Sequence, residues 1–361
     1  MKPDWRAVTS FLDSAVAGGA APGAVLGVSI DGARFLHTTG QLGADDGTPV
    51  EASTVYDLAS LTKVIGLATA LMLAVEEGKL DLDAPIQRYL PGFSGDLKER
   101  VTVRMLLAHT SGLPAWRPLF RETGSRAEAI ELAIKTPLES VPGARGAYSD
   151  LGSIVLTHAV ETIYGERLDS LLERRVFEPL GMHSLRFLPP DPVRIAPTEI
   201  DPWRGRVLRG EVHDENAARM DGVSGHAGLF GSAPDLLTFA EWVLEGWKDG
   251  KREGSKAGER PSFPPSLVQA FTSRQDLVPG SSRALGWDTP TPGGSAGSLL
   301  SGNSFGHTGF TGTSLWVDPE RRLAIVLLSN RVNPTRNNPR WNPVRGRIAD
   351  LVMTTLFEDA R

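Results

Sequence analysis

Ser60 and Lys63 are the first residues in this sequence whose types and spacing suggest catalysis. They lie at positions i and i+3 of a predicted helix, and such positions share a helix face. The amine of Lys63 would therefore lie beside the hydroxyl of Ser60 and could take its proton, which would make the serine a nucleophile. The helix N-terminus and partial burial both lower the pKa of an amine, so we expect Lys63 to act as a neutral base.

The Ser-x-x-Lys spacing alone is a weak signal because it arises easily by chance. If the match is a chance one, Ser60 is an ordinary helix N-cap without a catalytic role. A capping box, however, favours Glu or Gln three residues after the cap, and a cation in the first helical turn is unfavourable unless it has another role. The Lys63 position therefore favours the catalytic interpretation.

Two further motifs contain groups that can transfer protons. Tyr148, followed by Ser149 and Asp150, lies between a Gly/Pro-containing loop and a predicted helix, where a phenol could shuttle protons. His307 and Gly309 belong to a His-Thr-Gly motif at the end of a predicted strand, and the glycine would let a substrate backbone approach the strand edge. Taken singly, each motif could equally contain a buried structural tyrosine or a hydrogen-bonded core histidine.

Secondary-structure patterns predict the elements that must position these motifs. Asp31-Gly32 between two apolar runs predicts a β-hairpin, and the apolar stripe after Pro343 predicts a C-terminal helix. The expected strands cover residues 23–30, 33–39, 304–308, 313–317 and 323–329. The expected helices cover residues 4–17, 61–77, 102–108, 126–135, 150–163, 167–174, 234–247 and 264–272.

These elements predict an α+β fold, in which an antiparallel sheet built from both termini is flanked by helices and carries a mainly helical inserted lobe. Residues 1–80 and 281–361 would form the sheet lobe, and residues 81–280 the helical lobe, with the active site in the cleft between them. The segment 61–77 is apolar on nearly all faces, which predicts a central buried helix. Residues 249–262 are rich in Lys, Arg, Glu and Gly and are typical of a mobile surface loop.

Composition excludes several classes of protein. The formal net charge of −5 gives no basic patch for nucleic acid or an anionic membrane surface. The absence of cysteine excludes disulfides, thiolate metal sites and a cysteine nucleophile. No signal-peptide pattern and no apolar run of membrane-spanning length is evident, so we expect a cytoplasmic protein without a membrane segment, of unknown oligomeric state.

The ordered motifs Ser60-x-x-Lys63, Tyr148-Ser-Asp and His307-Thr-Gly resemble those of the serine β-lactamase and penicillin-binding-protein superfamily. Their spacing is that of class C-like members, and within the superfamily the chain resembles a family VIII-type carboxylesterase. Further similar segments at 55–60, 106–114, 177–182 and 225–231 extend the resemblance over nearly the whole chain. The resemblance implies a β-lactamase/transpeptidase-like fold without a cofactor.

By the same resemblance, Ser60 would form an acyl-enzyme while Lys63 and Tyr148 accept and return its proton, and His307 would complete the catalytic set. The backbone N–H groups of Ser60 and Phe310 would form the oxyanion hole. Which of Lys63 and Tyr148 is the dominant base stays open.

Two departures from the β-lactamase pattern bear on the substrate. Asp150 replaces the usual Asn, and it could either pair with Lys63, raising the amine's pKa, or bind a cationic substrate group. His307 replaces the usual Lys, which weakens the positive charge that recognises a substrate carboxylate. Esterases of the superfamily tolerate both changes. Further substrate contacts are expected from Thr308, Gly309 and Trp116.

The sequence therefore favours a carboxylesterase for short-chain or small aromatic esters, with a small-molecule ester or amide as its partner. Other activities that fit the motifs are those of a β-lactamase, a D-amino-acid amidase or DD-peptidase-like enzyme, and a penicillin-binding sensor that is acylated without turnover. The segment 213–215 with His226 matches none of the strong zinc patterns, so no metal is expected and these residues should shape a loop beside the cleft.

Overall fold

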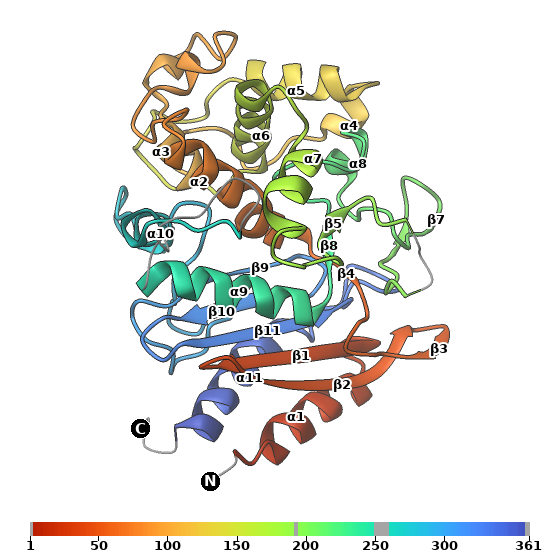
Figure 1. Ribbon diagram of the computed structural model, residues 1–361. Helices are drawn as coiled ribbons and strands as arrows, with labels where there is room; N and C mark the ends of the chain where they lie inside the picture. Colours follow the sequence, from red (N-terminus) through yellow and green to blue (C-terminus); the bar gives the residue numbers. More distant parts are fainter. Residues whose placement is uncertain (1–2, 191–193, 249–259, 358–361) are drawn as a thin grey trace.

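A six-stranded antiparallel sheet lies at the centre of the computed structural model, which describes residues 3–190, 194–248 and 260–357 (Figure 1). Its strand order is β3-β2-β1-β11-β10-β9, so β1 pairs with β11 and joins the two ends of the chain. The strands are β1 (Gly23–Ile30), β2 (Ala33–Gly43), β3 (Asp46–Pro49), β9 (Phe305–Thr308), β10 (Ser314–Asp318) and β11 (Leu323–Ser329). The predicted sheet built from both termini is confirmed.

The hairpin between β1 and β2 turns at the predicted dipeptide. Asp31 and Gly32 have φ angles of 47° and 81°, and Ile30 is paired with Ala33 across the turn. Two consecutive positive φ angles define the turn that matches the right-handed twist of the strands, and Asp-Gly adopts it readily. This turn fixes which side chains of β1 face each side of the sheet.

Both faces of the sheet are covered by helices (Figure 1). α1 (Arg6–Ala17) and α11 (Asn342–Leu356) pack on one face and α9 (Ala233–Lys248) packs on the other. Successive residues of β1 therefore enter different cores: Leu26 packs with α1 and α11, whereas Val25 belongs to the larger core with α9. The predicted division of the chain into two lobes stays a prediction.

The remaining α-helices follow β3 and precede β9 in the sequence, so they belong to the segment inserted between the N-terminal and C-terminal strands of the sheet. They are α2 (Thr69–Glu76), α3 (Val103–Leu107), α4 (Leu119–Glu122), α5 (Arg126–Lys135), α6 (Asp150–Tyr164), α7 (Leu168–Leu172), α8 (Glu215–Arg219) and α10 (Pro265–Thr272). Sequence patterns missed α4 and α8, because such short helices show no periodicity. The predicted loop 249–262 lies largely outside the described residues.

Two small sheets were also missed. β4 (Tyr56–Asp57), β8 (Leu229–Gly231) and β5 (Arg186–Phe187) form a three-stranded sheet, and β6 (Ile200–Asp201) pairs with β7 (Arg206–Val207). Strands of two or three residues are too short to show the alternation that identifies a strand. They matter because β4 leads directly to Ser60.

The predicted central helix begins irregularly. A 3₁₀ turn at Ala59–Leu61 and a π-helical segment at Lys63–Ala68 precede α2, and π-helical turns often occur at functional sites. The window Ala59–Glu76 is long and apolar enough to cross a membrane by composition, yet 83% of it is buried inside the protein. Such burial is typical of a core helix, which agrees with the sequence-based expectation.

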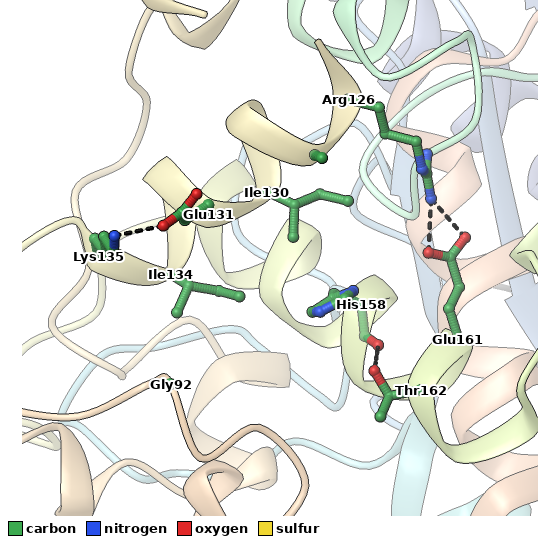
Figure 2. A pocket seen from close by; sticks show the side chains of 10 residues that line it. Gly92, Arg126, Ile130, Glu131, Ile134, Lys135, His158, Glu161 and Thr162 are labelled. Atoms are coloured by element: carbon green, nitrogen blue, oxygen red, sulfur yellow. Dashed lines mark hydrogen bonds and ion pairs between the residues drawn. The ribbon is translucent and has the colours of Figure 1, made fainter.

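A groove of about 720 Å³ runs between α5 and α6, away from the sheet (Figure 2). Ile130 and Ile134 form its apolar wall, and the ion pair between Arg126 and Glu161 lies at one end. His158 also lines this groove, and burial lowers its pKa. The groove shares no lining residue with the cleft described next.

Candidate active site

Ser60 lies in a tight turn between β4 and the central helix. Ala59, the residue before it, has a φ of 48°, which is uncommon for a residue other than glycine. The buried carboxylate of Asp57 accepts hydrogen bonds from the N–H of Ala59 at 2.8 Å and from the N–H of His213 at 2.6 Å. Asp57 therefore holds the turn in place and connects it to the loop that contains His213.

Lys63 is fully buried and its amine has three acceptors nearby. Nζ lies 3.3 Å from Oγ of Ser60, 2.7 Å from Oδ1 of Asp150 and 3.0 Å from the carbonyl oxygen of His226. An ammonium group has three N–H donors, so this arrangement satisfies the charged form. The predicted contact between Ser60 and Lys63 is present.

The expectation of a neutral Lys63 was wrong. Burial acts to lower the pKa of this amine, but the negative charge of Asp150 and the proximity of Tyr148 more than offset it, and the pKa is raised. Of the two roles considered for Asp150, the structure shows the pairing with Lys63. The raised pKa favours the charged form of Lys63 at neutral pH.

Tyr148 packs between two cations and two imidazole rings. Nζ of Lys63 lies 4.8 Å from the centre of its ring, and Cζ of Arg283 lies 4.9 Å from it. The rings of His109 and His307 lie at centroid distances of 4.6 Å and 5.8 Å. The phenol therefore lies beside the amine of Lys63, between the two catalytic motifs that the sequence predicted.

His307 is buried at the end of β9 and is neutral. Its Nδ1–H donates to the carbonyl of Thr308 at 2.8 Å, an assignment that follows because a carbonyl only accepts. Burial, together with the positive charges of Arg283 and Lys63, lowers the pKa of His307 to about 3. Nε2 has no hydrogen-bond partner within the described residues.

His109 is a neighbour of Tyr148 that sequence reasoning did not single out. Its Nδ1 accepts a hydrogen bond from the N–H of Ser149 at 3.1 Å, and burial lowers its pKa well below the usual value. The only sequence signal was its position in the segment 106–114, which resembles a family segment. His109 therefore positions the loop that carries Tyr148.

The strand end after His307 packs closely on the turn that carries Ser60. A Cβ on Gly309 would lie 2.1 Å from Oγ1 of Thr313 and 2.5 Å from the carbonyl oxygen of Leu58, so only glycine fits. Within the described residues, the N–H groups of Ser60 and Phe310 donate to no other backbone carbonyl. Both are therefore available for the predicted oxyanion hole.

A cleft of about 280 Å³ lies above Ser60. Trp116 and Phe310 border it with side chains that are 50% and 49% exposed, and the ring of Phe310 stacks on His213 at 5.6 Å. The cleft is lined by Ala59, Ser60, Trp116, Tyr148, Asp150, His213, Asp214, Glu215, His226, Ala227, Phe310 and Arg336. Most of the predicted site residues thus meet at one cleft.

Thr308 and Gly309 do not line this cleft. Thr308 ends β9 opposite Ser314, and the carbonyl of Gly309 accepts a hydrogen bond from Nη2 of Arg345 at 2.6 Å. Their role as substrate contacts stays a prediction.

The loop containing residues 213–215 borders the cleft, as the sequence led us to expect. His226 connects this loop to Lys63, because its Nε2 lies 2.8 Å from Oδ1 of Asp214 and its carbonyl accepts from Lys63. Arg336, by contrast, was missed by sequence reasoning, because its partners are more than a hundred residues away.

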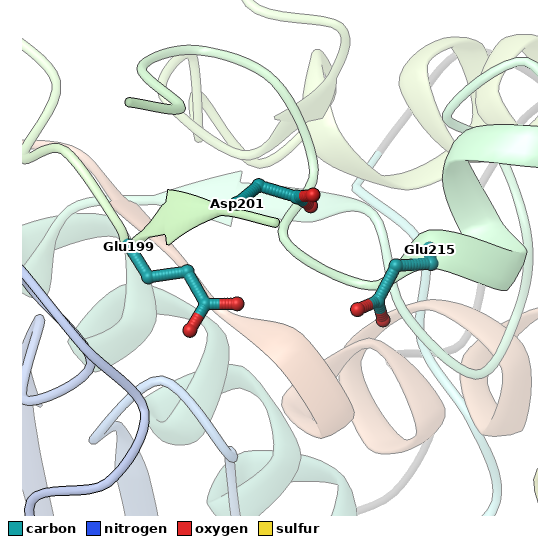
Figure 3. A group of neighbouring side chains, drawn as sticks. All are labelled: Glu199, Asp201 and Glu215. Carbon is teal, nitrogen blue, oxygen red and sulfur yellow. The ribbon is translucent and has the colours of Figure 1, made fainter. Parts of the chain in front are cut away.

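Three carboxylates, one of them from this loop, lie close together (Figure 3). Ligand atoms of Glu199, Asp201 and Glu215 lie within 4.8 Å of one another. Arg336 binds Glu199 and Glu215, and Arg204 binds Asp201. The negative charge of this cluster is therefore already matched by guanidinium groups.

Comparisons with known proteins agree with this arrangement. A family model described as Beta-lactamase matches residues 8–350. The protein named "Putative D-alanyl-D-alanine carboxypeptidase" of Escherichia coli (strain K12) is 35% identical, over 82% of this chain and 74% of the relative.

Solved structures show the same fold. EstCE1, described as a hydrolase with promiscuous acyltransferase activity, is 20% identical with a TM-score of 0.74, covering 95% of this chain and 97% of its own. A class C β-lactamase from Rhodobacter sphaeroides is 21% identical with a TM-score of 0.72, covering 97% and 99% of the two chains. At such low identity these two structures bear on the fold alone.

Proposed function

This chain belongs to the β-lactamase family and is a serine hydrolase with the expected β-lactamase/transpeptidase-like fold, and on that premise we propose that it is a carboxylesterase for short-chain or small aromatic esters. The observation that carries the proposal is the internal pairing of charges in the cleft.

The charged side chains that line the cleft have partners within the protein. Asp150 binds Lys63, Asp214 hydrogen bonds to His226, and Glu215 binds Arg336. A substrate that enters therefore meets Tyr148 and the aromatic rings of Trp116 and Phe310, and the neutral imidazole of His307 near Tyr148 adds no positive charge. Such a surface favours an uncharged ester over a penicillin, whose carboxylate needs a cation.

Tyr148 would act as the base in this reaction. The Ser60 hydroxyl passes its proton to the Tyr148 phenolate as Oγ bonds to the ester carbonyl carbon, and the ammonium of Lys63 stabilises the phenolate. The resulting oxyanion accepts hydrogen bonds from the N–H groups of Ser60 and Phe310, each worth about 3 to 4 kcal/mol of the barrier.

The second half of the reaction returns the proton. The bond from carbon to the leaving oxygen breaks, Tyr148 gives its proton to that alkoxide, and the acyl group stays on Ser60. Water then attacks the acyl carbon and passes a proton to Tyr148, which returns it to Oγ of Ser60. The acid product leaves and the site is regenerated.

The pairing of Asp150 with Lys63 weakens the case for an amidase. An amidase would use Asp150 to hold a substrate ammonium, yet Oδ1 of Asp150 lies 2.7 Å from Nζ of Lys63. A substrate amine would have to compete with a fully buried ammonium group for the same carboxylate.

A D-alanyl-D-alanine carboxypeptidase is the second candidate, favoured by the name of the E. coli relative and by two arginines near Gly309. Arg331 and Arg345 have no carboxylate partner in the described part of the chain. Arg345 donates to the Gly309 carbonyl at 2.6 Å, so a cation is present beside this strand end. A peptide carboxylate would need such a cation.

The test is kcat/KM for p-nitrophenyl butyrate, nitrocefin and a peptide ending in D-Ala-D-Ala, each with Ser60→Ala as the background control. A preference for the butyrate ester that Ser60→Ala abolishes supports the carboxylesterase. Preference for the peptide or for nitrocefin replaces that proposal with a carboxypeptidase or a β-lactamase. Stable acylation without turnover points to a sensor.

A further inference from the structure

The cleft above Ser60 has one wall made of a guanidinium group and carboxylates. We infer that Arg336, held between Glu199 and Glu215, determines acyl specificity by blocking the space that a long acyl chain would need. This inference rests on the proposed ester hydrolysis and names the size class of its acyl group. Its support comes from the contacts of Arg336 and from the direction in which the acyl group must point.

Arg336 is held firmly in position. Its Nε donates to Oε1 of Glu199 at 2.7 Å, and its Nη2 donates to Oε1 of Glu215 at 2.7 Å and also binds Glu199. Figure 3 shows the side chains of Glu199, which directly precedes β6, and of Glu215, at the start of α8, pointing toward one another. A planar guanidinium fixed by two carboxylates has little freedom to swing aside.

The network also includes a buried carboxylate and a second residue of the cleft lining, His213. Glu199 is 2% exposed, and Nε2 of His213 lies 3.2 Å from its Oε1. The N–H of Arg336 also donates to Oε2 of Glu199 at 3.1 Å. Because both the side chain and the backbone of Arg336 are anchored to one buried carboxylate, the wall behaves as a rigid part of the site.

Arg336 and Glu215 share the cleft with Ser60 and Tyr148. The leaving oxygen must face Tyr148, because it receives the proton that Tyr148 took from Ser60. In this proposal the acyl group extends from the carbonyl carbon away from Tyr148 and toward Arg336 and Glu215, which line the same cleft.

The dimensions and polarity of this part favour small acyl groups. The whole cleft holds about 280 Å³, at the lower end of the ~300–1,000 Å³ of ligand pockets. Extra methylene groups would have to displace Arg336 or lie against paired charges, and both are unfavourable for an alkyl chain. Acetyl to butyryl groups fit this description, and octanoyl groups do not.

The experiment measures how fast Ser60 is labelled by ethyl p-nitrophenyl alkylphosphonates that carry a methyl or an octyl group. Oγ of Ser60 bonds to phosphorus, p-nitrophenolate leaves, and the serine proton goes to Tyr148, so no turnover is needed. The variants are Arg336→Ala, Glu215→Ala and Arg336→Met. Rates come from intact mass spectrometry, and a peptide map verifies the label on Ser60.

Arg336→Ala should raise the octyl-to-methyl rate ratio about tenfold or more, because it removes the guanidinium from the cleft lining. Glu215→Ala removes only the carboxylate beside it and should raise the ratio less. Arg336→Met fills a similar volume and should keep the wild-type ratio. Arg206→Ala is the matched control, because Arg206 pairs with Glu211 outside the cleft lining.

Thermal melts show which variants fold. Glu215→Ala serves as the second variant in case Arg336→Ala does not fold, because it keeps the ion pair between Arg336 and Glu199. An unchanged ratio in folded Glu215→Ala and Arg336→Ala overturns the inference while leaving the esterase proposal intact. A wild-type protein that is not labelled at Ser60 by either reagent overturns the proposed function, and the inference with it.

Discussion

Replacing Asp150 by Asn should lower esterase activity by changing the charge of Lys63. Asp150 lies 2.7 Å from Nζ of Lys63, and two unit charges at that distance attract by about 6 kcal/mol at an effective dielectric constant of about 20. Asn keeps an amide oxygen but carries no charge, so this attraction is lost and the pKa of Lys63 falls, because burial is no longer offset. The amine then begins to lose its proton at a lower pH than in the wild type.

The assay is the pH dependence of kcat/KM for p-nitrophenyl butyrate between about pH 6 and 10. In the wild type the raised pKa of Lys63 keeps the ammonium beside Tyr148 throughout this range. In Asp150→Asn we expect kcat/KM to fall about 10- to 100-fold, with a loss of activity that begins at lower pH than in the wild type. Asp83→Asn removes an exposed carboxylate paired with Arg104 and serves as the matched control.

The free energy of unfolding should also depend on the charge of Lys63. A raised pKa in the folded state means that the pair with Asp150 contributes stability below the unfolded pKa of lysine, and that this contribution is lost as pH rises through the folded value. Asp150→Asn leaves the buried ammonium without a carboxylate partner and should cost about 3 to 5 kcal/mol at neutral pH. A folded Asp150→Asn variant with equal or higher kcat/KM would mean that neutral Lys63 is the base and that the proposed role of its charge is wrong.

Three further outcomes are expected. Tyr148→Phe removes the phenol but keeps the ring, so kcat should fall about 10²- to 10⁴-fold in steady-state assays with little change in melting temperature. Gly309→Ala places a Cβ 2.1 Å from Oγ1 of Thr313 and should abolish activity and lower the melting temperature, whereas Gly302→Ala, where nothing lies within 4 Å, should change neither. His307 has its pKa lowered to about 3, so the folded protein should lose stability as pH falls from about 6.5 toward 3, and urea melts of His307→Gln should show a smaller loss over that window. An imidazole that titrates near pH 6.5 by NMR would contradict this last expectation.

The sheet was predictable because its signals are local. Asp31-Gly32 adopts one preferred turn, and the terminal strands carry apolar runs that only a sheet covered on both faces can bury. The residues Ser60, Lys63 and Tyr148 were found for a similar reason, since each belongs to a short motif at a readable spacing. Their assignment as catalytic residues stays a prediction.

The charge of Lys63 was not predictable from its own segment. The helix N-terminus and burial act on the residue itself, and both lower the pKa, but Asp150 is 87 residues away in the sequence. Its carboxylate reaches Lys63 only because the Tyr148 loop and α6 fold onto the central helix. Two possibilities for Asp150 therefore stayed open until the geometry was known.

The wall of the cleft was unpredictable for the same reason. Arg336 pairs with Glu199 and Glu215 at separations of 137 and 121 residues, and nothing in the sequence around it marks a functional residue. The short strand β6 and the short helix α8, which position these partners, lack the periodicity on which sequence-based assignment depends.

Every step of the proposed mechanism depends on a covalent acyl-enzyme at Ser60 during ester hydrolysis. To detect it, the protein is mixed with excess p-nitrophenyl butyrate and quenched with acid during turnover, and the intact mass and the modified peptide are determined. We predict one added butyryl group on Ser60 in the wild type and none in Ser60→Ala. Hydrolysis that proceeds without an adduct, or with the adduct on another residue, would contradict the mechanism.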